Sequence, residues 1–194
     1  MHIGGIQMLH LKEKKINLEF IQKLTWDEVF DIWRKNEAYE GSHWHSHYQS
    51  RGFKTWEDWR MSYVKPFGLE DLNWQLFSIN DPLKAAPLFH GGPFRSWVEK
   101  FYQGQEFPSF ADLAQNPLVQ SHQGIQSFIK NFPKQTTLTG IILKGKIIIF
   151  EGMHRCAALA LAAKNGIKID SEIKIALAEY NKDLIPVIGV RTNP

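Results

Sequence analysis

A run of five residues, 151–155 (Glu-Gly-Met-His-Arg), combines charged, imidazole and glycine chemistry beside an expected helix. Apolar residues 147–150 precede it and strong helix formers, residues 156–164, follow it, an order that predicts a strand, a glycine turn and a helix. The first turn of a helix offers unpartnered backbone N–H groups and the positive end of the helix dipole, so anions bind there readily. This order therefore suits a phosphate-binding turn. Its residues are Gly152, Met153, His154 and Arg155.

Arginine suits this role because its planar guanidinium can donate two hydrogen bonds to one phosphate, and His154 adds charge and a further donor. Without an anion, the helix dipole disfavours Arg155 at a helix N-terminus. The alternative interpretation is an ordinary strand–turn–helix unit in which Arg155 lies on the surface.

Two regions of different composition would position this turn. Residues 1–72 are expected to form a helical extension packed on the core, because residues 16–72 read as helices. Thr25 and Thr55 each precede an acidic residue three positions later, which is a helix-capping pattern. Residues 41–52 between these helices form a polar, histidine-rich connector of uncertain structure.

Residues 73–194 predict an α+β domain, with a small mixed sheet flanked by helices. Strands are expected at residues 74–79, 137–143, 146–150, 173–178 and 186–190. Helices are expected at residues 95–102, directly after Ser109, and at residues 118–132 and 156–164. Lys144 and Gly145 predict a hairpin turn between the second and third strands.

The composition limits the class of protein. The 194 residues are 43% hydrophobic, which is enough for a packed core, and the formal net charge of +3 does not by itself indicate a nucleic-acid binder. Cys156 is the single cysteine, so no intramolecular disulfide can form. There is no apolar run of membrane-spanning length and no signal-peptide pattern. We expect a soluble, cytoplasmic protein without a membrane partner.

Three histidines alternate in the connector: His43, His45 and His47. On a strand they would face one way, which could suit a metal, whereas on a helix only His43 and His47 align. Glu40 is the only nearby carboxylate and no cysteine completes a four-ligand set, so we assign no metal site. A polar loop that contacts a substrate pocket is the simpler interpretation.

The tryptophans suggest a second alternative. They lie at positions 26, 33, 44, 56, 59, 74 and 97, with basic residues between them. They could stack on nucleic-acid bases, but a stacking platform also needs a basic groove. At helical spacing, aromatic residues are far more often part of the core, and we expect them there.

The turn at residues 151–155 resembles the second conserved box of the ParB family, in which a strand leads into Gly-x-x-Arg and an alanine-rich helix. It is still more similar to the sulfiredoxin signature Gly-Cys-His-Arg, which reads Gly-Met-His-Arg here. Residues 77–84 resemble the first ParB box. The resemblance covers roughly residues 74–179 and implies the ParB/sulfiredoxin fold, whereas residues 1–72 match nothing in these families.

The resemblance also limits the activity. The catalytic cysteine of sulfiredoxin would fall at Met153, and a thioether cannot serve as that nucleophile, so sulfinic acid reduction is not expected. The family includes free serine kinases, which resemble ParB domains and transfer phosphate from a nucleotide to a small hydroxyl. By this resemblance, residues 152–155 would bind the phosphates of ATP or another nucleotide. Glu151 would act as general base or Mg²⁺ ligand; its alternative is a carboxylate that caps the helix.

The same resemblance suggests two further contacts. Lys84 could neutralise a second phosphate, and the alternative is an exposed loop lysine. A second glycine-rich loop precedes an expected helix and could close over the ligand, although glycine and proline mark any turn. The candidate residues of this loop are His90, Gly91, Gly92 and Arg95.

The sequence therefore predicts a nucleotide-binding protein whose activity is phosphoryl transfer to a small molecule. The alternative is a non-catalytic ParB-like module that senses a nucleotide or binds DNA. A nuclease ranks third, because no paired acidic motif would hold two metal ions.

Overall fold

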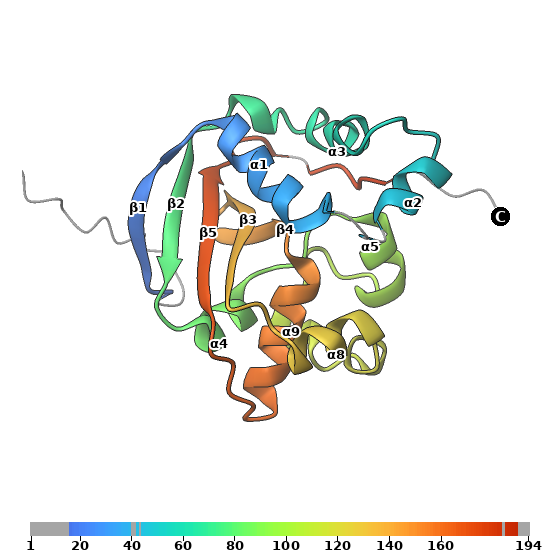
Figure 1. The fold of residues 1–194 in the computed structure, drawn as a ribbon. Helices are drawn as coiled ribbons and strands as arrows, with labels where there is room; N and C mark the ends of the chain where they lie inside the picture. Colours follow the sequence, from blue (N-terminus) through green and yellow to red (C-terminus); the bar gives the residue numbers. More distant parts are fainter. Residues whose placement is uncertain (1–15, 40–41, 43, 184, 190–194) are drawn as a thin grey trace, which may run out of the picture.

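The computed structural model describes residues 16–39, 42, 44–183 and 185–189. Within these residues, five strands form one mixed sheet in the order β1-β2-β5-β3-β4 (Figure 1). The strands are β1 (Leu18–Leu24), β2 (Trp74–Ile79), β3 (Gln135–Leu143), β4 (Lys146–Glu151) and β5 (Glu172–Glu179). β3 and β5 are parallel, and the other neighbours are antiparallel. The predicted α+β class is confirmed.

Helices lie on both sides of this sheet. They are α1 (Trp26–Glu37), α2 (Trp44–Ser50), α3 (Trp56–Val64), α4 (Pro82–Ala85), α5 (Arg95–Phe101), α6 (Phe110–Leu113), α7 (Pro117–Gln120), α8 (Gln123–Lys130) and α9 (Met153–Lys164). Figure 1 shows α1 and α3 at the top of the molecule and α9, α8 and α4 at the bottom. We call α1, α2 and α3 the N-terminal helical layer. Within the described part of the chain, no helix is both long and apolar enough to cross a membrane.

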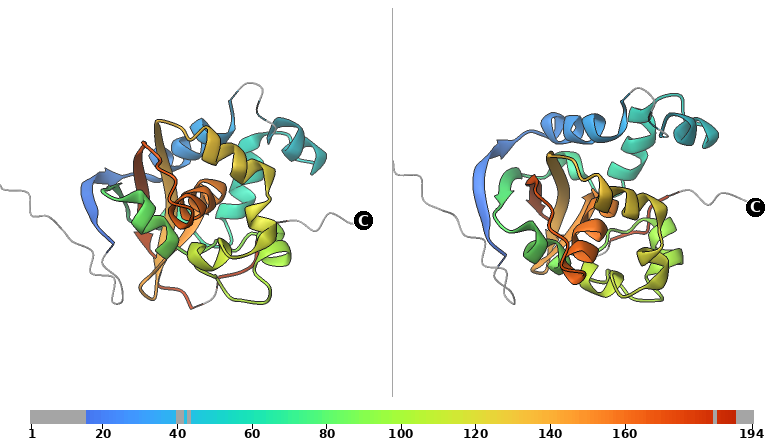
Figure 2. Two further views of the ribbon diagram at one scale, coloured as in Figure 1. Left: turned by 90° about the horizontal axis from the view of Figure 1, so that it is seen from below. Right: turned by 60° about the horizontal axis from the view of Figure 1, so that its bottom comes forward.

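The strands have alternating faces because successive side chains point to opposite sides of a sheet. On β4, Ile147 and Ile149 belong to the core cluster that contains α9, whereas Ile148 and Phe150 belong to the cluster formed with α1 and α3. Two cores therefore sandwich the sheet. The views in Figure 2 show α9 at the centre of its layer, between α4 and α8.

Local signals predicted several elements correctly. Thr25 forms a full capping box with Glu28 at the start of α1, and the side chain of Thr55 accepts a hydrogen bond from the backbone N–H of Asp58 at the start of α3. Lys144 and Gly145 both have positive φ, as a two-residue hairpin between β3 and β4 requires.

The helical interpretation of residues 16–72 is wrong for residues 18–24, which form β1. This strand pairs antiparallel with β2 along the edge of the sheet, and a bulge lies between Phe20 and Gln22. Nothing local marks the segment as a strand. The partner strand, whose paired residues lie 50 or more positions away in sequence, supplies the hydrogen bonds that decide its conformation.

The structure also defines the connector and the end of the described chain. Most of the histidine-rich connector is helical, since α2 spans Trp44–Ser50. Of the strand expected at residues 186–190, Ile188 makes only an isolated bridge with Phe94, and Val190 lies outside the described residues.

The second glycine-rich loop packs against the outer edge of β4. The N–H of His90 donates to the carbonyl of Ile147 at 2.8 Å, and the N–H of Ile149 donates to the carbonyl of His90 at 3.0 Å. A Cβ on Gly92 would overlap the carbonyl oxygen of Ile149, and one on Gly91 would overlap the Tyr102 hydroxyl. Both glycines are therefore required for close packing of this loop on the sheet.

This packing gives a stability prediction. Gly92→Ala should lower the free energy of unfolding by about 2–3 kcal/mol, because the new methyl group meets backbone that cannot move aside. Gly52→Ala is the control: Gly52 has a φ of 82° and open space around it, so only backbone strain of about 1 kcal/mol is expected. Urea unfolding of both variants measures the difference, and equal losses would contradict this account of the loop.

Candidate functional site

The predicted turn begins at Gly152, which joins β4 to α9. Its φ of 99° and ψ of 18° lie in the left-handed region, which disfavours any residue with a side chain. A Cβ at this position would also overlap the side chain of Leu138. The carbonyl of Gly152 accepts a hydrogen bond from the N–H of Cys156 at 2.9 Å, which starts the helix. The glycine is therefore required by the fold as well as suited to an anion.

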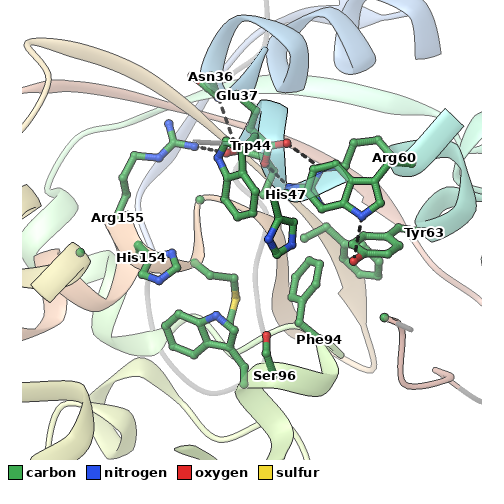
Figure 3. Close-up of a pocket in the computed structure, with 18 of the residues that line it drawn as sticks. Asn36, Glu37, Trp44, His47, Arg60, Tyr63, Phe94, Ser96, His154 and Arg155 are labelled. Carbon is green, nitrogen blue, oxygen red and sulfur yellow. Dashed lines mark hydrogen bonds and ion pairs between the residues drawn. The ribbon is translucent and has the colours of Figure 1, made fainter. Parts of the chain in front are cut away.

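The turn opens on a cavity of about 710 Å³ (Figure 3). Residues of α1, α2 and α3 line it together with residues of α5, α8 and the β4–α9 turn, so it lies where the N-terminal helical layer meets the rest of the fold. All the turn residues predicted from the sequence, 151–155, are in its lining. Small-molecule sites commonly enclose about 300–1,000 Å³, so the size suits a ligand as large as a nucleotide.

Arg155 is already engaged by protein groups. Its guanidinium forms an ion pair with Glu151 and donates a hydrogen bond to the hydroxyl of Thr136, and only 6% of the residue is exposed. The expectation of an arginine fork open to phosphate is thus wrong for this arrangement, and so is the alternative of a surface arginine. The physical reason is burial, because a guanidinium inside the protein needs a carboxylate partner.

Glu151 is held equally firmly. One carboxylate oxygen binds Arg155, and the other accepts a hydrogen bond from the amide of Asn36 at 3.0 Å. Burial raises the pKa of the Glu151 carboxyl, and the adjacent Arg155 guanidinium opposes that rise. Glu37 lies near enough to raise the pKa further. The Glu151 carboxyl therefore lies in the cavity wall, and its ion pair with Arg155 limits how far its pKa rises.

A second buried ion pair lies in the same wall. Arg60 of α3 donates to both carboxylate oxygens of Glu37 on α1 through two guanidinium nitrogens, Nε and Nη2, with Nε 2.6 Å from Oε2. The indole N–H of Trp56 donates to the same carboxylate at 3.0 Å. The guanidinium carbon of Arg60 also lies 4.0 Å from the centroid of the Trp59 ring. Figure 3 shows the Glu37–Arg60 pair and the Arg155 side chain around the same hollow.

His154 belongs to a group of rings at the start of α9. Its ring centroid lies 5.2 Å from that of Trp97 and 5.0 Å from that of His122. Burial lowers the pKa of His122, and the positive charge of Lys100 lowers it further. All three rings line the cavity. The site thus offers imidazole donors and acceptors beside the amides of the α9 turn.

The lining carries a surplus of positive charge. Among the described residues, five basic and three acidic side chains line the cavity, with histidines taken as neutral. Lys35 is ion-paired at 3.0 Å with Asp31, which does not line the cavity, so the excess of two positive charges falls to one when this partner is counted. The basic residues are Lys35, Arg51, Arg60, Arg95 and Arg155, and the acidic ones are Glu37, Glu99 and Glu151. An anionic ligand is therefore favoured over a cationic one.

Other predicted residues lie elsewhere. The Lys84 side chain is 87% exposed, is ion-paired with Asp81 at 2.7 Å and does not line the cavity. Of the second glycine-rich loop, Arg95 lines the cavity and donates to the carbonyl of Gly189 at 3.1 Å, whereas the two glycines pack against β4 and Tyr102. The loop still touches the site, since the N–H of Gly92 donates to the sulfur of Met153 at 3.2 Å.

The histidine-rich connector contributes to the cavity through His47, which lines it. His43 and Glu40 lie outside the described residues, and so does the side chain of His45. Among the residues that are described, no group of three or more His, Cys, Asp or Glu side chains could hold a metal ion.

Several site residues escaped the sequence reasoning. Among the residues of the cavity wall that it missed are Asn36, Glu37, Arg60 and His122, whereas Trp44 and Trp97 were considered for base stacking and expected in the core. The helical spacing of apolar residues places Glu37 and Arg60 on the inward faces of α1 and α3. A charged residue on an apolar face needs a partner, so this spacing could have predicted that the two residues pair. No local pattern connects Asn36 to Glu151, since 115 residues separate them.

Comparison with protein-family models, with curated proteins and with solved structures gave no match for this chain.

The buried ion pair yields a prediction. Arg155→Met should lower the free energy of unfolding by about 3–5 kcal/mol, because Glu151 is left buried without its counterion. In this variant the pKa of Glu151 is raised in the folded protein above its unfolded value. The folded state then takes up a proton more readily, so the stability loss should be smaller at pH 5 than at pH 8.

Urea unfolding at the two pH values measures this dependence. Adding Glu151→Gln to Arg155→Met should recover part of the loss, since the unpaired charge is removed. Lys84→Met, which breaks an exposed pair, is the control and should leave the unfolding midpoint unchanged. An Arg155→Met variant as stable as the wild type at pH 8 would contradict this assignment.

Proposed function

We propose that the cavity binds a nucleotide, or a similar phosphate-bearing small molecule, as in the ParB/sulfiredoxin-like proteins that the turn resembles. The observation that carries the proposal is the start of α9, where Gly152 and His154 face a positively charged cavity of about 710 Å³. A helix N-terminus inside a cavity stabilises an anion through its amides and its dipole. His154 supplies a hydrogen bond or a charge beside them.

Phosphoryl transfer to a small hydroxyl compound is the activity proposed for this site. The acceptor oxygen would attack the terminal phosphorus, the bond to the bridging oxygen of the nucleotide would break, and the hydroxyl proton would pass to a carboxylate. Glu151 is the proposed base, and its raised pKa suits proton uptake. Asn36 and Arg155 hold the carboxylate in the cavity wall, so the hydroxyl must approach the edge of this ion pair.

The described residues do not by themselves fit a magnesium site. Both oxygens of Glu151 are engaged, and no further carboxylate, histidine or cysteine joins it in a group of three or more among those residues. Mg²⁺ is commonly bound by substrate phosphates and one or two carboxylates. We therefore assign no step of the reaction to a protein-bound metal.

Nucleotide binding without turnover is the second candidate. It is favoured by the firm hold on Glu151, which makes the carboxylate a structural partner of Arg155. Sulfiredoxin chemistry is not proposed: Met153 stands at the cysteine position, and burial raises the pKa of the Cys156 thiol, which keeps it protonated. A single, buried cysteine is compatible with the cytoplasmic location that we propose. DNA binding and nuclease activity rank below these two.

Ligand binding is tested first. Thermal shifts with ATP, GTP and CTP, each with and without Mg²⁺, should show a raised melting temperature for at least one nucleotide, because a ligand that binds only the folded state stabilises it. His154→Ala should weaken the affinity of that nucleotide about tenfold in calorimetric titration, the loss of one charge-assisted hydrogen bond. Lys84→Ala should leave the affinity unchanged, since Lys84 lies outside the cavity. The absence of any shift would contradict the proposal.

Turnover separates the two candidates. Phosphoryl transfer predicts that Glu151→Gln lowers nucleotide consumption at least 100-fold, the usual effect of removing a general base, while the dissociation constant changes little. The glutamine keeps a carbonyl oxygen for Arg155, and urea unfolding checks that the variant stays folded. A wild-type protein that binds nucleotide but neither hydrolyses nor transfers phosphate, with a panel of small alcohols and amino alcohols present, would be the non-catalytic module.

A further inference from the structure

We infer that the cavity has a second subsite, which holds the flat aromatic ring of the ligand between α2 and the residues at the start of α5 and α9. This inference rests on the proposed function and narrows it, because it selects a nucleotide over a sugar phosphate or free polyphosphate. One wall of the subsite, formed by α2, would come from the N-terminal helical layer, outside the segment that resembles ParB and sulfiredoxin.

One wall of the subsite is aromatic and belongs to α2. Trp44 and His47 lie three residues apart, hence on the same side of the helix, and both line the cavity. Their ring centroids are 5.2 Å apart, and Trp44 lies 5.4 Å from the buried ring of Trp59. Both α2 side chains are half-buried, so each keeps part of its surface open. Figure 3 shows Trp44 and His47 directed into the hollow.

Buried groups behind this wall fix its position. The Arg60 guanidinium lies 4.0 Å from the ring centroid of Trp59 and 5.4 Å from that of Trp44, and Glu37 holds it in place. The hydroxyl of Tyr63 accepts a hydrogen bond from the indole N–H of Trp59 at 3.1 Å. A wall supported in this way loses little conformational freedom when a ring stacks on it, which favours affinity.

The facing wall belongs to the rest of the fold. Phe94 and Trp97 line the cavity from the start of α5, and Phe94 contacts Tyr63 with centroids 6.2 Å apart. Trp97 lies edge-on to His154, with centroids 5.2 Å apart. In Figure 3, Phe94 lies directly below His47 in the view, and His154 lies to their left. Aromatic side chains of α2 and of the start of α5 thus line the same cavity as the α9 turn.

These walls suit a nucleobase better than a sugar. The hydroxyl groups of a phosphorylated sugar would lose hydrogen bonds against indole and phenyl faces, and that loss is costly. A base stacked on an aromatic side chain usually tightens binding about 5- to 150-fold. Because His154 belongs both to the phosphate turn and to the facing wall, a ring joined to a phosphate can contact both subsites at once.

The test compares ligands that share a phosphate chain but differ in having a base. Calorimetric titration with inorganic triphosphate, ATP and CTP should show at least one nucleotide binding tenfold or more tightly than triphosphate. Trp44→Ala should remove most of this difference and leave the triphosphate affinity within about twofold of wild type. Trp44→Phe, which keeps a flat ring, should retain most of it. His154→Ala should weaken all three ligands.

Trp26→Ala is the matched control, since Trp26 is also a half-buried tryptophan of the N-terminal helical layer but does not line the cavity. It should leave every affinity unchanged, and urea unfolding checks that each variant is folded. Triphosphate binding as tightly as both nucleotides would overturn the ring subsite and leave the phosphate site standing. So would a Trp44→Ala variant that weakens triphosphate and nucleotides equally. Failure of all three ligands to bind the wild type would overturn both the subsite and the proposed function.

Discussion

Buried charge must be paired, and this requirement fixes the geometry where the N-terminal helical layer meets the sheet. Two ion pairs satisfy it: Glu37 with Arg60 inside the layer, and Glu151 with Arg155 at the end of β4. Asn36, the residue before Glu37 on α1, ties the helical layer to the sheet, because its amide donates to the Glu151 carboxylate at 3.0 Å and to the carbonyl of Thr137 at 3.1 Å. The wall of the cavity is therefore held by hydrogen bonds that have preferred distances and directions, which apolar contacts lack.

The sequence predicted the elements whose signals are local. Caps at Thr25 and Thr55 and the turn at Lys144 are decided by residues within four positions, so they could be predicted correctly. β1 could not, because its strand character comes from pairing with β2. α2 was left uncertain for a related reason: it has seven residues, too few to be stable alone, and the packing of Trp44 on Trp59 helps to hold it in place.

The candidate site also has one part that local sequence predicts and one part that depends on tertiary contacts. The position of the turn was predictable, since an apolar strand, a glycine and a helix-forming run lie next to one another in sequence. Glu151, one partner of Arg155, lies only four residues earlier, so this pair was within reach of local reasoning. Thr136, the other partner, was not predictable, because it is 19 residues away and belongs to β3. His47 belongs to the histidine-rich connector, for which a polar loop at a substrate pocket was the simpler interpretation; in the structure it lies on α2 and lines the cavity, with its ring near those of Trp44 and Trp59. Its position depends on these tertiary contacts, which the sequence does not reveal.

The pairing of Arg155 changes where affinity must come from. A guanidinium neutralised by Glu151 adds little net attraction for phosphate, so the amides of the α9 turn, His154 and the small surplus of positive charge in the lining remain. Hydrogen bonds of this kind contribute about 0.5–3 kcal/mol each after desolvation. A ligand recognised by them alone would bind weakly, whereas a stacked ring would add apolar contact that costs no polar partner. A phosphate-binding turn with a modest surplus of positive charge and aromatic residues beside it therefore favours a ligand that carries a nucleobase as well as phosphate.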